Sequence, residues 1–128
     1  MKTFREYIAE NVTFRELKAV EIFADRLLAK FDVDVEFTKH FADRMNDERN
    51  HPEIAIGELV KLFQKIAQNQ AEKIKKYPGS EVVLKDIQSD LNMPVVLKYD
   101  RKRGEIDVVS KTIMRKKNFK TSNTVLRY

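Results

Sequence analysis

Residues 13–31 carry the strongest local folding signal in the sequence. Thr13-Phe14-Arg15-Glu16 has the spacing of a capping box, in which the Thr13 side chain accepts from the third helical N–H and Glu16 reaches back. Apolar residues then recur at steps of three and four, at positions 14, 17, 20, 24, 27, 28 and 31. One stripe of this kind is typical of a helix packed on a core. The sequence therefore predicts a helix that begins here, with a membrane-surface helix as the alternative.

Residues 32–78 predict one strand and two further helices. Residues 32–37 alternate between polar and apolar, which indicates a short strand with one wet face, at an edge. Thr38 is a suitable N-cap for a helix through about Arg49, and His51-Pro52 closes it because the residue before proline disfavours helical backbone. Apolar spacing from Ile56 predicts a third helix toward Tyr77, before Pro78-Gly79.

The last part of the chain predicts a sheet. Residues 80–91 have apolar spacing that suits either a helix or a strand, and we favour the helix. Strands over 94–99 and 105–114 flank a loop in which Gly104 suits a positive φ. We therefore expect one α+β domain over residues 11–128, with N-terminal helices packed on a small antiparallel sheet and a C-terminal basic β-hairpin.

Charge is unevenly distributed along the chain. The formal net charge is +5, but residues 98–128 hold ten Lys and Arg against three Asp and Glu, whereas residues 1–97 hold 15 against 17. A basic block raises the local concentration of anions and is the usual electrostatic feature of nucleic-acid binders. Nucleic acid, either RNA or DNA, is the predicted partner, and a solvated basic tail is the alternative.

The composition argues against several other classes of site. The absence of cysteine removes disulfides, thiolate zinc sites and cysteine nucleophiles. The three glycines do not form a phosphate-binding loop, and no paired-carboxylate metal motif is visible. No apolar run reaches the roughly 20 residues of a membrane span, and the N-terminus lacks the apolar core of a secretion signal. We expect no metal, no cofactor and no membrane association.

A helix over residues 38–49 would place His40, Arg44 and Glu48 on one face. Histidine exchanges a proton near neutral pH, and arginine holds a phosphate bidentately. Cleavage of RNA by its own 2′-OH needs a proton acceptor, a proton donor and cations, but no metal. His40 with Arg44, Lys111 and Arg115 could supply that set if the helix and the late strand converge. A solvated helix face is the alternative.

Basic residues with an interleaved aromatic form the predicted binding surface. Cations contact backbone phosphates while Phe119 or Tyr128 stacks on a base. The predicted nucleic-acid-binding residues are Arg44, Arg49, Arg101, Lys102, Arg103, Lys116, Lys117, Phe119 and Lys120.

The opening Met1-Lys2-Thr3-Phe4-Arg5-Glu6-Tyr7-Ile8-Ala9-Glu10 resembles the capsid-targeting sequence of internal head proteins from T-even-type tailed phages. The resemblance covers ten residues and implies transport into the assembling prohead. It also implies cleavage by the prohead protease after Glu10, so that the mature chain begins at Asn11. The implied location is the capsid interior, and then the host cytoplasm if the protein is ejected with the DNA. A short amphipathic helical turn is the alternative.

Residues 35–119 are similar to the fold shared by RelE-type toxins, colicin D and related metal-independent ribonucleases. The similarity rests on Phe37-Thr38-Lys39-His40 with Arg44 and Arg49 after a short strand, and on Val108-Val109-Ser110-Lys111-Thr112 in a late strand. In some of those families a helix-borne histidine and late-strand Lys or Thr residues line the cleavage site. The resemblance implies catalytic roles for His40, Lys111 and Thr112. The long helix over residues 14–31 departs from the minimal toxin pattern.

Two functions are therefore compatible with the sequence. The first is a phage internal head protein whose body binds nucleic acid and cleaves RNA without a metal. The second is a non-enzymatic protein, either a DNA-binding component of the prohead core or an injected inhibitor of a host defence enzyme. They differ in whether His40 lies close to Lys111 or Arg115 across an open cleft.

Overall fold

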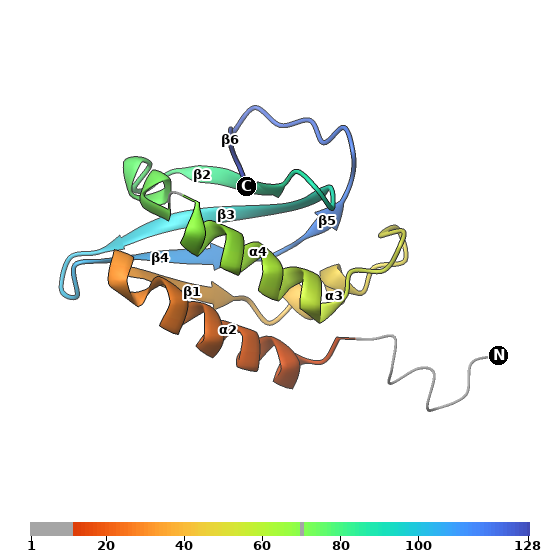
Figure 1. The fold of residues 1–128 in the computed structure, drawn as a ribbon, viewed down its shortest axis with the longest axis horizontal. Helices are drawn as coiled ribbons and strands as arrows, with labels where there is room; N and C mark the ends of the chain where they lie inside the picture. Colours follow the sequence, from red (N-terminus) through yellow and green to blue (C-terminus); the bar gives the residue numbers. More distant parts are fainter. Residues whose placement is uncertain (1–11, 70) are drawn as a thin grey trace.

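The computed structural model describes residues 12–69 and 71–128 and has a mixed sheet with α2 and α4 along one face (Figure 1). The helical segments are α2 (Phe14–Leu28), η1 (Ala29–Phe31), α3 (Phe41–Met45), α4 (Ile56–Gln68) and η2 (Ala71–Lys76). The strands are β1 (Val33–Phe37), β2 (Glu81–Asp86), β3 (Leu91–Asp100), β4 (Glu105–Ser110), β5 (Met114–Arg115) and β6 (Thr124–Arg127). The combination of helices and sheet confirms the α+β class. The predicted capsid-targeting segment lies outside the described residues.

The strand order is β1-β4-β3-β2-β6, and β5 pairs with the beginning of β3. The β3 strand is antiparallel to β2, β4 and β5, but β1 is parallel to β4 and β6 is parallel to β2. The prediction of an antiparallel sheet was therefore wrong at both ends of the strand order. The two parallel strands come from distant parts of the chain, and local patterns cannot reveal such pairings.

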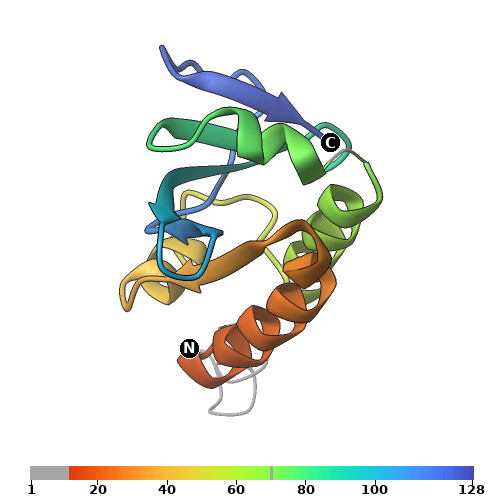
Figure 2. The ribbon, with the colours of Figure 1, turned by 90° about the vertical axis from the view of Figure 1, so that its left-hand side faces the viewer.

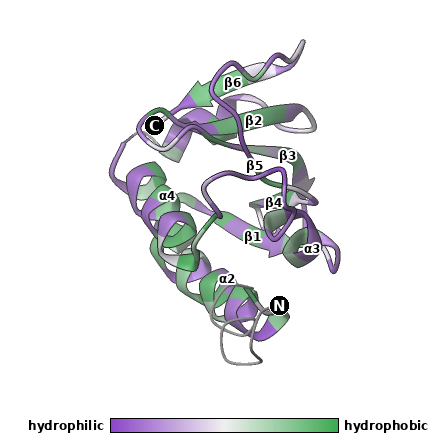
Figure 3. Cartoon of the chain, turned by 90° about the vertical axis from the view of Figure 1, so that its right-hand side faces the viewer, coloured by the Kyte–Doolittle hydropathy of each residue, from purple (hydrophilic) through white to green (hydrophobic). Residues whose placement is uncertain are grey.

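The α2 helix begins as predicted, because Thr13 and Glu16 form the complete capping box. Its buried residues, Leu17, Val20, Ala24 and Leu28, face α4 and β1. Figures 2 and 3 show α2 and α4 side by side along one face of the sheet. The α-helix ends at Leu28 and η1 at Phe31, and the following Asp32, with a φ of 58°, turns the chain into β1. The buried apolar side chains form one core between these helices and the sheet.

Two carboxylates of α2 bond to the outer edge of β1. Asp25 Oδ1 accepts from the Val35 N–H at 2.7 Å, and Glu21 Oε2 accepts from the Phe37 N–H at 3.1 Å. The sequence prediction of a short strand at an edge is confirmed, since β1 stands at one end of the strand order. An edge strand has unpaired N–H groups, and these two side chains satisfy two of them.

The helix predicted from Thr38 to about Arg49 is much shorter, because α3 covers only Phe41–Met45. The Thr38 N–H bonds to the Ser110 carbonyl, which extends the β1–β4 ladder beyond Phe37. Thr38 is therefore held by the sheet rather than acting as an N-cap. Glu48 lies beyond the end of α3, so the expected helical face of residues 40, 44 and 48 does not form.

The helix favoured for residues 80–91 is also wrong, because this segment contains β2, a turn at residues 87–90 and the start of β3. Val82, Val83 and Leu84 are all buried in β2, which has a hydrogen-bonded strand on each side, and Val82 and Leu84 belong to the core between the helices and the sheet. The helix predicted from Ile56 toward Tyr77 divides into α4 and η2.

The strand predicted to end at Met114 is interrupted. The β4 strand ends at Ser110, and β5 resumes the pairing with β3 at Met114. The Ser110 hydroxyl lies 3.0 Å from both the Pro94 and Thr112 carbonyls, which fixes the break. In the turn between β3 and β4, Gly104 has the predicted positive φ, of 65°. Two further strands follow β4, so these strands are not the C-terminal element of the sheet.

Candidate nucleic-acid interface

A pocket of about 470 Å³ lies between the chain around α3 and the segment that contains β5. These two segments meet at the right-hand end of the sheet in Figure 1. The lining residues are Arg44, Asp47, Arg49, Asn50, Thr112, Ile113, Met114, Arg115 and Lys116. Five of the residues predicted from the sequence to bind or process nucleic acid therefore share one pocket: Arg44, Arg49, Thr112, Arg115 and Lys116.

Arg115 forms a wall of this pocket, and its guanidinium is occupied by the protein itself. Its Nη2 atom lies 2.8 Å from both carboxylate oxygens of Glu58, at the start of α4. The guanidinium also donates to the carbonyls of Pro52, Glu53 and Ser89, at 2.8, 3.1 and 2.9 Å. These bonds join β5 to α4 and to two loops. They give Arg115 a structural role and leave its guanidinium few free N–H groups with which to bind a substrate.

The buried Asn50 side chain connects the two sides of the pocket. Its Oδ1 atom accepts from the Arg115 N–H at 2.9 Å, and its Nδ2 atom lies 3.2 Å from the carbonyls of Arg44 and Met45. Asn50 thereby gives a partner to the Met45 carbonyl at the C-terminus of α3 and a second one to the Arg44 carbonyl, which also accepts from the Asp47 N–H at 3.3 Å. Asn50 therefore fixes α3, and with it Arg44, relative to β5.

The backbone of Lys116 is held in the same way. Its N–H donates to the Asp90 carbonyl at 3.0 Å, and its carbonyl accepts from Asn92 Nδ2 at 2.9 Å. Asn92 is buried, and its Oδ1 atom accepts from Lys85 Nζ at 3.1 Å. The Lys116 side chain is exposed, so a mobile cation extends from a fixed backbone position.

Two cations of the pocket lack a carboxylate partner. Arg44 and Lys116 are exposed, and neither forms an ion pair within residues 12–69 and 71–128. Arg49 differs, because its Nε and Nη2 atoms donate to Asp47 at 3.1 and 2.9 Å. The hydrogen bonds and charge of Arg49, with a smaller contribution from the charge of Arg44, lower the pKa of Asp47 to about 2. Asp47 is therefore ionised at neutral pH, and Arg44 and Lys116 remain available for an anion.

The predicted catalytic set is not gathered in this pocket. His40 is the N-cap residue of α3, and its side chain is 69% exposed, with Nδ1 3.9 Å from Asp43 Oδ2. His40 is not among the residues that line the pocket. Lys111 lines a separate pocket of about 180 Å³ beside β2, β3 and β4, to which Thr112 also contributes.

The other predicted binding residues lie elsewhere. Arg101, Lys102 and Arg103 are exposed in the turn that precedes β4, whereas the pocket lies beyond the end of that strand. Figure 1 shows this turn at the opposite end of the sheet from α3 and β5. Lys117, Phe119 and Lys120 lie between β5 and β6, and only Phe119 is partly buried. The basic block is therefore divided between two ends of the domain.

Tyr128, the alternative aromatic for base stacking, is buried and belongs to the core. Burial raises the pKa of its phenol to about 12. Stacking by Tyr128 was therefore a wrong prediction.

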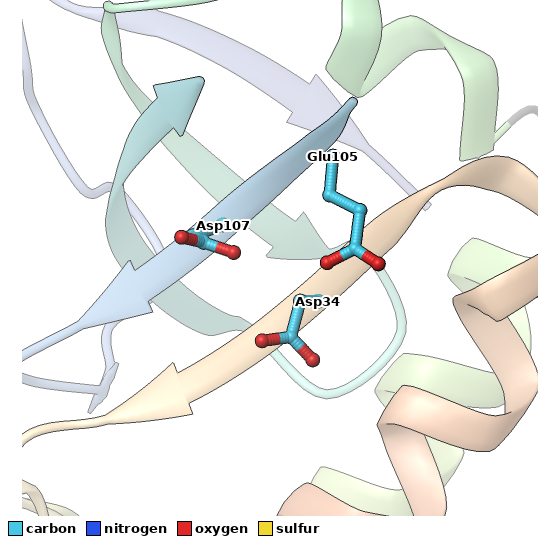
Figure 4. A group of neighbouring side chains, drawn as sticks. All are labelled: Asp34, Glu105 and Asp107. Carbon is cyan, nitrogen blue, oxygen red and sulfur yellow. The ribbon is translucent and has the colours of Figure 1, made fainter. Parts of the chain in front are cut away.

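Three carboxylates form a group that the sequence analysis did not find. Asp34 of β1 and Glu105 and Asp107 of β4 offer oxygen atoms that all lie within 4.8 Å of one another (Figure 4). Burial raises the pKa of Asp107, and the negative charges of Asp34, Asp100 and Glu105 add to this rise. Carboxylate oxygens are hard ligands of the kind that Mg²⁺ and Ca²⁺ prefer. Both strands had alternating patterns with carboxylates on the wet face, but only the β1–β4 pairing brings them together.

Asp25 lies near this group, on α2. Burial is the main cause that raises its pKa to about 7, and Asp34 and Glu21 raise it further, while the hydrogen bond from Val35 lowers it. A carboxyl group with this pKa changes its charge near neutral pH.

Comparison with known proteins gives no relative for this chain. No protein-family model, curated protein or solved structure matches it. Among the described residues, no helix has the length and apolar character needed to cross a membrane.

Proposed function

We propose that this protein binds nucleic acid through its phosphates, in the pocket between α3 and β5. The observation that carries the proposal is that Arg44 and Lys116, from distant parts of the sequence, line one pocket without carboxylate partners among the described residues. Both stand on backbone held by buried asparagines. Because the backbone is already held, only side-chain freedom is lost when Arg44 and Lys116 bind a phosphate.

The arrangement favours binding over cleavage. Metal-independent cleavage of RNA needs an acid and a base that converge on one phosphate. His40 is outside the pocket, and the Arg115 guanidinium already bonds to Glu58 and three carbonyls. We therefore expect purified protein not to cleave mixed RNA in the presence of EDTA. Cleavage that is lost in His40→Ala would favour the ribonuclease instead.

We also propose a phage setting, in which residues 1–10 direct the protein into the capsid together with DNA. This proposal rests on the resemblance of Met1–Glu10 to capsid-targeting sequences. Incubation with a T-even-type prohead protease, followed by mass spectrometry, should give a product that begins at Asn11. A chain left intact by an active protease, or cut elsewhere, would contradict the capsid route.

The binding proposal is tested by fluorescence anisotropy with a labelled single-stranded oligonucleotide over a range of salt concentrations. The double variant Arg44→Ala/Lys116→Ala should bind about tenfold or more weakly. The slope of the logarithm of its affinity against the logarithm of the salt concentration should be less steep by roughly 1.4. The matched control Arg101→Ala/Lys102→Ala removes the same charge at the other end of the domain. Equal losses in both variants would indicate non-specific attraction and contradict a site at the pocket.

A further inference from the structure

The ion pair between Arg49 and Asp47 gives the pocket a fixed planar surface. Two nitrogen atoms of the guanidinium bond to the two oxygens of one carboxylate, Nε to Oδ1 at 3.1 Å and Nη2 to Oδ2 at 2.9 Å. The Asp47 Oδ1 atom also accepts from the Arg49 N–H at 2.9 Å. Rotation of the guanidinium is thereby restricted, yet the Arg49 side chain is 81% exposed, so its flat faces are accessible.

Because Asp47 neutralises Arg49, this arginine is poorly suited to binding phosphate. A guanidinium plane has a second use, since unpaired bases stack on it as they do on aromatic rings. None of the residues that line the pocket is aromatic, and its planar groups are the guanidinium groups of Arg44, Arg49 and Arg115. Arg115 is bonded to Glu58 and three carbonyls, whereas Arg49 is both exposed and oriented by Asp47, which makes it the best placed of the three for stacking.

The pocket has the size and lining that a base requires. Its volume of about 470 Å³ lies within the roughly 300–1,000 Å³ of pockets that hold small organic ligands. The half-buried Met114 supplies apolar surface, and Thr112 supplies polar groups beside it. Simple neutralisation of a phosphate backbone would not need a hollow.

We propose that the pocket holds one unpaired nucleotide, with its base stacked on Arg49 and its flanking phosphates bound by Arg44 and Lys116. The protein therefore selects single-stranded over double-stranded nucleic acid. This inference rests on the proposed function and adds the substrate class. A duplex keeps its bases stacked, and placing one in the pocket requires that it be flipped out of the helix at a cost in free energy.

The experiment compares a labelled single strand with a duplex of the same sequence, by anisotropy at one salt concentration. Wild type should bind the single strand at least about tenfold more tightly. Arg49→Lys keeps the charge but removes the plane, and it should weaken single-strand binding about tenfold with an unchanged salt slope. Arg103→Lys, the same change in the distant turn, is the matched control. A 2-aminopurine base in the strand should change its emission with wild type but not with Arg49→Lys.

Thermal unfolding of each variant verifies that it is folded, which we expect because Arg49 and Arg103 are exposed. Equal affinity for strand and duplex would overturn the inference and leave phosphate binding intact. Unchanged single-strand binding by Arg49→Lys would overturn the stacking role. Absence of binding to either form would overturn both the inference and the proposed function.

Discussion

Asp34 and Asp107 are register partners on the parallel strands β1 and β4, with carboxylates close together on one side of the sheet. Like charges on adjacent strands destabilise a sheet. One oxygen of Asp107 is buried and has no hydrogen-bond partner among the described residues. The pair therefore costs free energy whenever both groups are ionised.

Substitution of Asp107 tests this repulsion. Because the folded state raises the pKa of Asp107, its ionisation disfavours folding at higher pH. Asp107→Asn should stabilise the protein at about pH 8 by up to about 1 kcal/mol, after allowance for solvent screening. The gain should disappear well below the ordinary pKa of the group. Urea unfolding at both pH values measures it, and Asp43→Asn, on an exposed carboxylate, is the control. A loss of stability at about pH 8 would contradict the repulsion.

The pKa of Asp25 predicts a pH-dependent stability. In the folded state the pKa of Asp25 is about 7, against the ordinary 3.8, so protonation of this carboxyl stabilises the folded protein. This contribution is complete below pH 3.8, decreases as the pH rises from 3.8 to about 7, and is lost above about 7. Because Asp25 is partly exposed, we expect a loss of about 2 kcal/mol rather than the full linkage value. Asp25→Asn can still accept from Val35, and it should be less pH-dependent between about pH 5 and pH 8 in denaturant titrations. A wild-type protein that gains stability over this range would contradict the assignment.

The bonds of Arg115 predict a large effect on stability. Arg115→Ala leaves Glu58 and three carbonyls without this partner, and the Arg115 side chain is only 11% exposed. Loss of one member of a largely buried pair costs roughly 3–5 kcal/mol, and we expect about 3 because Glu58 remains partly hydrated. Arg49→Ala removes an exposed ion pair and should leave stability nearly unchanged. Chemical denaturation compares the two, and similar losses would show that Arg115 is not structural.

Loss of the capping box at the start of α2 should lower stability by less than the loss of Arg115. Thr13→Ala removes the bond that the Glu16 N–H donates to the threonine hydroxyl at 3.2 Å, and should cost about 1 kcal/mol. Thr13→Ser retains the hydroxyl and should stay close to wild type. Thermal melts of the three proteins measure this difference. If Thr13→Ser and Thr13→Ala were equally destabilised, the methyl group rather than the cap would be responsible.

The candidate site was only partly predictable. The sequence indicated Lys116 through the basic excess of residues 98–128, and Arg44 and Arg49 through the predicted helix and the resemblance to ribonucleases. It did not distinguish them from Arg101, Lys102 and Arg103, which the β4 strand separates from the pocket. It predicted a catalytic role for Arg115, although the Arg115 guanidinium forms an ion pair with Glu58. Which cations are free depends on which acidic groups the fold places beside them.

By itself, the sequence determined features that depend on near neighbours in the chain: the start of α2 at its capping box, the alternation of β1 and the positive φ of Gly104. Capping, periodicity and turn conformation act over a few residues, so their patterns are readable locally. The tertiary structure alone decided the parallel pairing of β1 with β4, the strand at residues 81–86 and the pocket that joins Arg44 to Lys116. These depend on contacts between residues far apart in sequence, whose free energy is set only when the core packs.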